Sequence, residues 1–381
     1  RGLGDVYKRQ GLVMSEENKK HLVVAAAGTG GHVFPALAVA RELRNRGWKI
    51  SWIGTQTGME SKLIAKDAID FTGLDFNGVR GKGFFGMISG GIKLLKAMSR
   101  CKSLMRELKP DVMFTTGGYV AVPVASGCRK NGVRVAVMNC DADLLMSTEM
   151  ILKDAWGVAC GFAGSARSRA ASKGRITGNP VRAEIEAVEA PETRLAGRTG
   201  PLKLLVFGGS LGARVLNETV PKALALFDPE NRPQVLHQCG AGSVEEAKKC
   251  YADAGVEAEI VPFIEDMAKA YTESDLVICR AGATTVAELC AAGAASVLVP
   301  FVAKTTKHQL GNARYMAMNN AGLCVPQESL TPEHLFGILA SMKREKILQT
   351  AVNARALCRP KAAAAVADMI EDIAAMKTKP V

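Results

Sequence analysis

The stretch HLVVAAAGTGGHVFPALAVARELRNR, residues 21–46, decides the fold. Its first part, His21–Ala27, is a short apolar run typical of a buried strand, and Pro35–Arg46 carries apolar residues at helical spacing. The loop Gly28-Thr29-Gly30-Gly31-His32 lies between them. We therefore predict a strand, a glycine turn and a helix, which together open a parallel α/β sheet.

The same alternation continues along the chain. Further strands of a first sheet are predicted at Lys49–Gly54, Asp111–Thr115, Arg134–Met138 and Trp156–Cys160. The pattern restarts after Val181–Pro201, a charged stretch broken by Pro and Gly that we predict to be a linker with a short helix. Strands of a second sheet are predicted at Lys203–Phe207, Gln234–Gln238, Glu257–Val261, Leu276–Cys279 and Ser296–Val299. Because helical stretches separate the strands, we expect both sheets to be parallel, with right-handed crossovers.

The length of 381 residues exceeds what one hydrophobic core usually serves, so two domains are expected. We predict one domain over 19–180, a second over 181–359, and a C-terminal helix, 360–377, that packs across the domain junction. Residues 1–18 are expected to lie outside the core, and Arg1–Gln10, which precede Met14, are expected not to be native. The predicted fold class is α/β, with two Rossmann-like, doubly wound domains that face a central cleft.

Composition and charge exclude several classes of protein. The ten cysteines show no CxxC pair and no zinc-site spacing, which argues against a structural metal or a disulfide framework and favours a reducing cytoplasm. No apolar run reaches the ~20 residues of a membrane-spanning helix, so membrane contact is expected to be peripheral. The net charge of +12 indicates an anionic partner, but no nucleic-acid-binding motif accompanies it.

A glycine turn between strand and helix brings backbone N–H groups and the positive helix end to a phosphate. The second domain repeats the turn as Gly208-Gly209-Ser210-Leu211-Gly212-Ala213. Neither turn completes a dinucleotide-binding fingerprint, because the Gly28 turn lacks its third glycine and neither following strand ends in a ribose-binding acid. A nicotinamide-dependent oxidoreductase is therefore a weak alternative, and for either turn alone a tight bend that binds nothing stays open.

A third small-residue loop, Arg280-Ala281-Gly282-Ala283-Thr284, follows the strand Leu276–Cys279. The helix that it opens would present N–H donors around Gly282–Thr284 to a diphosphate and stabilise the charge of a leaving group. Glu288 lies about one turn further on, where its carboxylate can accept from both hydroxyls of a ribose. Taken alone, a glutamate at such a position is more often a solvated helix residue.

Together these motifs resemble the MurG family of peptidoglycan glycosyltransferases. The resemblance extends from about Lys20 to Ile373 and is carried by GTGGHVFPALAVA from Gly28, Gly58-Met59-Glu60, Gly81-Lys82-Gly83, GGYVAVP from Gly117, GNPVR from Gly178, GGSLGARVLN from Gly208, FIEDM from Phe263, RAGATTVAEL from Arg280, and His308-Gln309 with Asn312. It implies a GT-B fold and an inverting enzyme without cofactor or metal. It also implies UDP-N-acetylglucosamine as donor and lipid I, undecaprenyl-pyrophosphoryl-N-acetylmuramyl-pentapeptide, as the acceptor that becomes lipid II.

The resemblance also assigns roles to individual residues. It implies that His32 is the base that removes the proton of the acceptor hydroxyl, the alternative being a helix-cap or packing histidine. The residues implied to bind the acceptor are Gly28, Thr29, Gly30, Gly31, Gly117, Gly118 and Tyr119. The residues implied to bind the donor are Asp141, Arg182, Ser210, Phe263, Ile264, Gly282, Ala283, Thr284, Glu288, His308 and Gln309.

The chain departs from the family pattern at two places. Met138-Asn139-Cys140-Asp141 stands where the family usually reads His-Glu-Gln-Asn, and an ionised Asp141 accepts hydrogen bonds but cannot donate them. Thr306-Lys307 replaces an acidic pair. These departures keep two alternatives open, a related transferase with another donor or acceptor and a non-catalytic UDP-sugar-binding paralogue. Asp141-Ala142-Asp143 also spells the DxD of metal-dependent transferases of another fold, which we interpret as coincidence.

The segment Phe84–Leu108 combines apolar and cationic residues. The apolar set is Phe84, Phe85, Met87, Ile88, Ile92, Leu94, Leu95 and Met98, and the cations are Lys93, Lys96, Arg100, Lys102 and Arg106. Such a helix either lies among anionic lipid headgroups or covers its own sheet. The resemblance favours the first, and it implies a peripheral protein on the cytoplasmic face of the cell inner membrane with cell-wall synthesis proteins as partners.

Overall fold

The computed structural model describes residues 19–76, 84–303 and 307–380, and of residues 84–90 it describes the backbone only. The predicted terminal segment, the Gly81-Lys82-Gly83 motif and Thr306 lie outside these ranges. Chain contacts define two compact units. The first unit contains the chain up to Met138, Met146–Val158 and the residues from Ala363, and the second contains Asn139–Leu145 and Ala159–Ala362. The chain therefore passes between the units several times, and the boundaries expected at residues 180 and 359 stay predictions.

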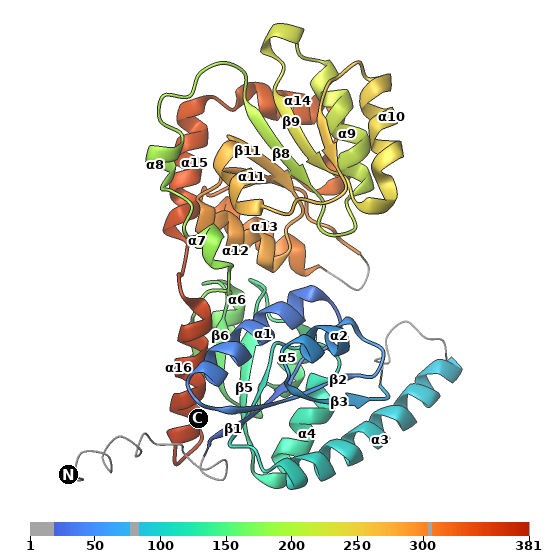
Figure 1. The fold of residues 1–381 in the computed structure, drawn as a ribbon, viewed down its shortest axis with the longest axis vertical. Coiled ribbons are helices and arrows are strands. Elements are labelled where there is room, and N and C mark those ends of the chain that lie inside the picture. Colours follow the sequence, from blue (N-terminus) through green and yellow to red (C-terminus); the bar gives the residue numbers. More distant parts are fainter. Residues whose placement is uncertain (1–18, 77–83, 304–306, 381) are drawn as a thin grey trace, which may run out of the picture. The chain divides into compact units, whose positions relative to one another are not determined.

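The first sheet has seven strands in the order β3-β2-β1-β4-β5-β6-β7 (Figure 1). Its strands are β1 (His21–Ala25), β2 (Lys49–Thr55), β3 (Asp70–Leu74), β4 (Val112–Thr115), β5 (Arg134–Asn139), β6 (Ala155–Cys160) and β7 (Gly174–Ile176). The helices among them are α1 (Gly30–Asn45), α2 (Met59–Lys66), α3 (Phe84–Leu108), α4 (Ala121–Asn131), α5 (Met146–Ile151) and α6 (Ser165–Arg169). Strand β1 pairs in parallel with β2 on one side and with β4 on the other. The strand order therefore reverses between β1 and β4, the switch point at which doubly wound sheets bind ligands.

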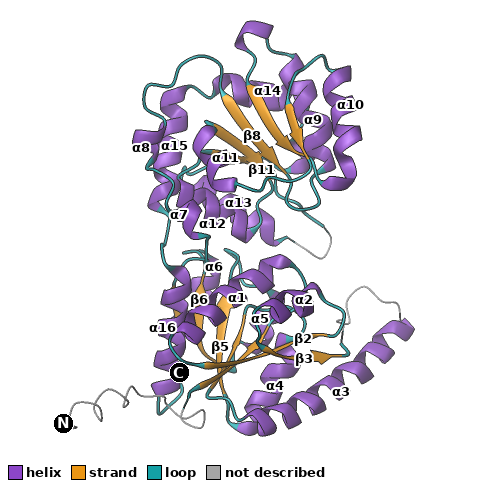
Figure 2. Ribbon diagram, viewed as in Figure 1, coloured by secondary structure: helices purple, strands orange, loops and turns teal. Residues whose placement is uncertain are grey.

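The second sheet has six strands in the order β10-β9-β8-β11-β12-β13, and all its neighbouring strands are parallel (Figure 2). Its strands are β8 (Lys203–Phe207), β9 (Gln234–Gln238), β10 (Glu259–Val261), β11 (Leu276–Cys279), β12 (Ser296–Leu298) and β13 (Leu323–Cys324). The remaining helices are α7 (Ala183–Glu186), α8 (Pro191–Arg194), α9 (Arg214–Ala225), α10 (Val244–Asp253), α11 (Met267–Glu273), α12 (Ala283–Ala292), α13 (His308–Met318), α14 (Pro332–Ser341), α15 (Arg344–Ala356) and α16 (Ala362–Ala375). This sheet has its own switch point, between β8 and β11.

Helices cover both faces of the second sheet. Along β8, Leu204 and Val206 belong to one hydrophobic cluster, which includes residues of α9, α14 and α15. Leu205 and Phe207 belong to the other, which includes residues of α11, α12 and α13. Alternate side chains of a strand point to opposite faces, so a strand covered on both faces is apolar throughout. This double burial is why the sequence predicted the bounds of β8 and β11 correctly.

Three strands, β3, β7 and β13, were not predicted, and all three are edge strands. Strand β3 reads DFTGL and has one buried residue, Leu74, and β13 has only two residues. An edge strand pairs on one side only and need not be covered on both faces. Its sequence therefore lacks the continuous apolar run on which the prediction depended.

Helix α16 packs against the first unit, as its contacts with the end of α1 show. Arg46 Nη1 lies 2.6 Å from Asp368 Oδ1 and 2.7 Å from Glu371 Oε2. The indole of Trp48 also donates to Glu371 at 3.2 Å. A C-terminal helix is present as predicted, at Ala362–Ala375, and its packing across the domain junction stays a prediction. Among the described residues no helix combines the length and apolarity required to cross a membrane.

Candidate functional site

Each sheet carries small-residue loops at the carboxyl ends of the two strands that flank its switch point. In the first sheet, the Gly28–Gly31 loop follows β1 and Gly117-Gly118 follow β4. In the second sheet, the Gly208–Ala213 loop follows β8 and Ala281-Gly282 follow β11. Ligands of doubly wound sheets bind at these positions. The two pairs of loops therefore define the candidate site, and each is described within its own sheet.

The helices that begin at three of these loops have first turns suited to an anion. Within the described chain, α1, α9 and α12 have no side-chain N-cap hydrogen bond and no acidic residue in the first turn. By contrast, α11 and α14 are capped by the side chains of Asp266 and Thr331. The first N–H groups of a helix have no partner within the helix, and a phosphate satisfies them where no side chain does.

His32 lies in the first turn of α1, and the loop after β4 orients its ring. Nδ1 lies 3.0 Å from the carbonyl oxygen of Thr116, and Thr116 Oγ1 donates to the His32 carbonyl at 2.9 Å. A carbonyl oxygen only accepts, so Nδ1 carries the hydrogen and Nε2 of the neutral ring carries the lone pair. The half-buried imidazole can thus accept a proton at Nε2.

The structure brings two predicted acceptor residues, Gly28 and Tyr119, together. Gly28 has φ +104°, and a Cβ at this position would lie 3.5 Å from the Tyr119 ring. Burial raises the pKa of Tyr119, whose hydroxyl is hydrogen-bonded to Thr55. The buried carboxylate of Glu60 accepts from the Thr55 hydroxyl at 2.6 Å and from the Thr55 N–H at 2.8 Å. Glu60, from the Gly58-Met59-Glu60 motif, therefore holds Thr55, the residue to which the Tyr119 hydroxyl is hydrogen-bonded.

The glycines after β4 lie close to His32 but use their N–H groups within the protein. Gly117 donates to Thr115 Oγ1 at 3.1 Å, and Gly118 donates to Ser147 Oγ at 3.1 Å. A Cβ on Gly118 would lie 3.8 Å from the His32 ring. The structure therefore favours a role for these glycines in letting the loop approach His32.

In the second unit, the Gly208–Ala213 loop and Arg280, which directly follows β11, line a cavity of about 760 Å³. Its lining consists of Gly208, Gly209, Ser210, Leu211, Gly212, Ala213, Arg214, Val215, Glu218, Arg280, Phe301, Gln309 and Gln327. Of the predicted donor residues, Ser210 and Gln309 belong to this lining. A cavity of this size, bordered by glycine backbone and by the half-buried cation of Arg280, can hold a phosphorylated ligand.

Arg280 is a cavity residue that the sequence analysis placed in the third loop without giving it a role. Its guanidinium lies 5.5 Å from the centre of the Phe301 ring and donates to the Val299 carbonyl at 3.1 Å. Burial lowers the pKa of Arg280, but a guanidinium keeps its charge at neutral pH. The sequence signal that could have identified Arg280 is its position directly after β11. Phe301 and Gln327 had no comparable signal, because both come from loops outside the glycine motifs.

Gln309 and Asn312, both on α13, link the second-unit loops to one another. Gln309 Oε1 accepts from the N–H groups of Phe301 at 2.8 Å and Ala281 at 3.3 Å, so its Nε2 group is the part that can donate to a ligand. The buried amide of Asn312 donates to Asp141 Oδ1 at 2.8 Å and to the Ala281 carbonyl at 3.0 Å. Asp141 thus belongs to the second unit and lies beside the loop after β11.

Glu288 is buried in α12, which excludes the alternative of a solvated helix residue. Its Oε1 lies 3.3 Å from Arg182 Nη2, and its Oε2 accepts from the Tyr271 hydroxyl at 3.2 Å. Burial raises the pKa of Glu288, and the neighbouring Arg182 cation acts in the opposite direction. The structure therefore brings together two of the residues predicted to bind the donor and shows Tyr271, which no motif had marked, as a hydrogen-bond partner of Glu288.

The other predicted donor residues lie outside the lining of the cavity. They are Arg182, Phe263, Ile264, Gly282, Ala283, Thr284, Glu288, His308 and Asp141, and their roles stay predictions. Phe263 is 61% exposed in the loop after β10, and His308 begins α13. Both carboxylates of the DxD sequence accept hydrogen bonds within the protein. Asp143 accepts from Ser165 Oγ at 2.5 Å, and Asp141 accepts from the amide of Asn312.

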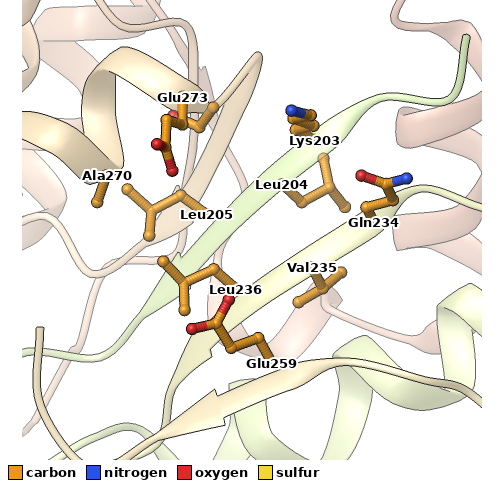
Figure 3. A pocket seen from close by; sticks show the side chains of 10 residues that line it. Lys203, Leu204, Leu205, Gln234, Val235, Leu236, Glu259, Ala270 and Glu273 are labelled. Atoms are coloured by element: carbon orange, nitrogen blue, oxygen red, sulfur yellow. The ribbon is translucent and has the colours of Figure 1, made fainter.

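A second hollow, of about 200 Å³, lies at the other end of the second sheet. Figure 3 shows its lining, in which leucines of β8 and β9 lie beside polar side chains such as Gln234 and Glu259. Lys203, Gln234 and Glu259 are the first residues of their strands. The hollow therefore lies toward the amino ends of the strands, away from the switch point, and is not part of the candidate site.

Comparison with known proteins agrees with the fold and with these loops. Residues 22–148 match the glycosyltransferase family 28 N-terminal domain, and residues 203–373 match the C-terminal domain of that family. The protein of Methylibium petroleiphilum named UDP-N-acetylglucosamine--N-acetylmuramyl-(pentapeptide) pyrophosphoryl-undecaprenol N-acetylglucosamine transferase is 48% identical over 93% of this chain and 97% of its own. The protein of the same name from Chromobacterium violaceum is 47% identical over 93% of this chain and 98% of its own.

Among solved structures, Acinetobacter baumannii MurG superposes with a TM-score of 0.81 at 37% identity, covering 93% of this chain and 99% of that one. The two parallel sheets and this similarity confirm the GT-B fold that the sequence resemblance implied. The near-complete coverage of both curated relatives confirms the resemblance itself. The chain therefore belongs to the MurG family of N-acetylglucosaminyltransferases.

Proposed function

We infer that the protein transfers N-acetylglucosamine from UDP-N-acetylglucosamine to lipid I, at the 4-hydroxyl of the N-acetylmuramyl unit, and so forms lipid II for peptidoglycan synthesis. The observation that carries this inference is the 48% identity across 93% of the chain to a transferase named for this reaction. The paired glycine loops support it, because both substrates carry a diphosphate that helix N-termini can bind.

For the donor, we propose that the diphosphate of UDP binds to the first turns of α9 and α12. Arg280, just before the loop that opens α12, supplies a cation in the cavity that the Gly208–Ala213 loop lines, and Ser210 belongs to that lining. These groups would stabilise the charge that UDP gains as it leaves. Glu288 already has Arg182 and Tyr271 as partners, but a carboxylate has about four acceptor positions and can also receive ribose hydroxyls.

For the acceptor, we propose that the pyrophosphate of lipid I binds to the first turn of α1, at Gly28–Gly31. The acceptor oxygen attacks C1 of the N-acetylglucosamine unit while its proton passes to Nε2 of His32. The bond from C1 to the diphosphate oxygen breaks, and the electron pair leaves with UDP. Attack from the face opposite the leaving group inverts the configuration at C1. The hydrogen bond from Nδ1 to Thr116 supports this role, because it leaves Nε2 as the basic nitrogen.

We further propose that α3 lies on the cytoplasmic face of the cell inner membrane. One stripe of the helix, Ala97, Cys101, Leu104 and Met105, is buried, and α3 packs against α4. Ile92 and Leu95 lie outside this stripe and are 53% and 67% exposed. The side chains of Phe84, Phe85, Met87 and Ile88 lie outside the description. Exposed apolar residues beside Lys93 and Lys96 suit an anionic lipid surface.

The test of the function is transfer of a radiolabelled sugar to a lipid I analogue, with UDP-N-acetylglucosamine, UDP-N-acetylgalactosamine and UDP-glucose compared as donors. We expect transfer from the first donor. A preference for another donor would instead favour a transferase of altered specificity, for which Asp141 is the motivating observation. UDP binding without any transfer would indicate a non-catalytic UDP-sugar-binding paralogue.

A further inference from the structure

A chain of buried polar side chains lies behind the Gly208–Ala213 loop, and the reaction as described does not use it. It consists of Tyr251 on α10, His237 on β9 and Asn217 on α9, and all three side chains are at most 2% exposed. His237 Nδ1 lies 2.8 Å from the Tyr251 hydroxyl, and His237 Nε2 lies 3.0 Å from Asn217 Oδ1. Asn217 Nδ2 donates to the Cys239 carbonyl at 3.2 Å.

The chemistry of these groups fixes the direction of every bond. The amide oxygen of Asn217 only accepts, so Nε2 of His237 carries the hydrogen. Nδ1 of His237 is then the acceptor, and the Tyr251 hydroxyl must donate to it. This leaves the amide nitrogen of Asn217 as the only part of that side chain able to donate to Cys239. Each member of the chain thus orients the next.

This series of hydrogen-bonded side chains ends at the Cys239 carbonyl, and the Gly208–Ala213 loop is packed against that carbonyl. Gly212 has φ +74°, and a Cβ at this residue would lie 1.9 Å from the Cys239 oxygen. A Cβ on Gly240 would in turn lie 2.4 Å from the Leu211 carbonyl oxygen. Backbone therefore meets backbone with no space between them, and a shift of the Cys239 carbonyl must move the loop that lines the cavity.

We propose that Tyr251, His237 and Asn217 form a positioning relay that holds the Gly208–Ala213 loop in the shape that binds the diphosphate of the UDP-sugar donor. The proposal rests on the function inferred above, because it takes UDP as the ligand of this loop. None of the three residues touches the donor. They act through the Cys239 carbonyl, which sets the position of Gly212 and with it the first turn of α9.

A merely structural role predicts a different outcome from a positioning role. If the three residues only stabilise the fold, their loss lowers the melting temperature, and the folded protein still binds UDP normally. If they position the loop, the folded variants lose donor affinity while the acceptor KM is unchanged. Loss of one buried hydrogen bond corresponds to a three- to tenfold change in affinity, at about 1 kcal/mol per bond.

The experiment uses the full chain with Tyr251→Phe, which removes one hydroxyl, and the pair His237→Leu and His237→Gln. Isothermal titration calorimetry with UDP, circular dichroism and the KM of each substrate are measured for all variants. Tyr315→Phe is the matched control, because its hydroxyl is bonded to the backbone of Ala163 in the same unit. We expect Tyr251→Phe and His237→Leu to raise the UDP Kd and the donor KM about three- to tenfold. We expect His237→Gln, which retains a donor for Asn217, to restore much of that loss.

Three results would overturn the relay. The first is UDP affinity equal to that of the wild type in folded Tyr251→Phe and His237→Leu. The second is equal weakening by Tyr315→Phe, and the third is a parallel rise in both substrate KM values. If the wild type binds UDP and the variants bind it equally well, the relay is refuted and the proposed function still stands. Absence of UDP binding by the wild type removes the proposed function and the relay with it.

Discussion

Nδ1 of His32 donates to the Thr116 carbonyl, so the role proposed for His32 as a base depends on the other ring nitrogen, Nε2. We predict that His32→Ala lowers turnover about 100- to 10,000-fold, the usual contribution of a general base. The donor KM should stay within about twofold of the wild type, because the donor loops belong to the second sheet. Steady-state kinetics at saturating acceptor measures both, with His334→Ala, an exposed histidine on α14, as the control. Near-native turnover in His32→Ala would remove this residue as the base.

The side chain of Asp141 accepts a hydrogen bond from the buried amide of Asn312, and a carboxylate has no N–H to donate. In Asp141→Asn the oxygen can still accept from Asn312, and the new amide nitrogen can donate to a sugar hydroxyl. We therefore predict a donor KM several-fold lower, with an unchanged melting temperature, measured by kinetics and thermal unfolding. Unchanged donor KM and unchanged preference among UDP-sugars would show that this position does not read the sugar.

Sequence reasoning marked candidate residues that lie in motifs and did not mark residues whose contacts are made across the fold. His32, Ser210 and Gln309 were predicted because each lies in or beside a recognisable loop. Tyr271, Tyr251 and His237 were not, because their partners are distant in sequence or carry no motif. The contact between Tyr271 and Glu288, for example, joins α11 to α12 through a hydroxyl that no local pattern distinguishes from a core tyrosine.

At the scale of elements, α3 covers its own unit along one stripe and leaves apolar residues exposed, which is compatible with the membrane contact proposed above. Its second half packs on the protein, and Ile92 and Leu95 remain exposed. We predict that Ile92→Ser with Leu95→Ser weakens binding to vesicles of anionic phospholipid at least about tenfold, because two apolar side chains lose their burial in lipid. Vesicle sedimentation measures this, with Leu226→Ser, an exposed leucine that follows α9, as the control. Equal binding of the double variant would contradict a membrane role for this face.

The burial of His237, where β9 packs against α9 and α10, makes stability depend on pH. Burial lowers the pKa of His237 to about 4 from its ordinary 6.5, and the groups that face the ring are the Tyr251 hydroxyl and the Asn217 amide. Between these two values the unfolded chain binds the proton and the folded chain does not. Stability from this group is therefore fully present above pH 6.5 and is lost as the pH falls toward 4, by about 3 kcal/mol.

We accordingly predict that the difference in free energy of unfolding between wild type and His237→Gln shrinks as the pH is lowered from 7.5 to 4.5. Urea unfolding of both proteins at several pH values measures this difference. A difference that is constant with pH would contradict the assignment of a neutral, buried His237.

The strands that are buried on both faces were the ones that the sequence predicted best. The inner strands β1, β8 and β11 are covered on both faces, and their apolar runs predicted them well. The edge strands β3, β7 and β13 were missed because one-sided pairing leaves no such run. The stretch Val181–Pro201, expected as a linker with one short helix, contains both α7 and α8. Arg194 of α8 is buried there and donates to the carbonyls of Tyr271 and Gly293, which the charge pattern did not reveal.

For the molecule as a whole, the net charge of +12 agrees with the chemistry of the inferred substrates. The donor carries a diphosphate, the acceptor carries a pyrophosphate, and the acceptor lipid resides in a membrane with anionic headgroups. In the proposed reaction, positive charge at helix N-termini, at Arg280 and along α3 would bind these three anions. This correspondence explains a strongly basic protein that carries no nucleic-acid-binding motif.

The most direct test of the account follows the sugar itself. The purified full chain is incubated with radiolabelled UDP-N-acetylglucosamine and a lipid I analogue, and the lipid product is isolated and its new linkage is determined by NMR. The account predicts that the label moves to the N-acetylmuramyl 4-hydroxyl with inverted, β configuration, and that His32→Ala abolishes most of this product. Label that stays on UDP-sugar although UDP binds, or a product that retains the α configuration, would contradict it.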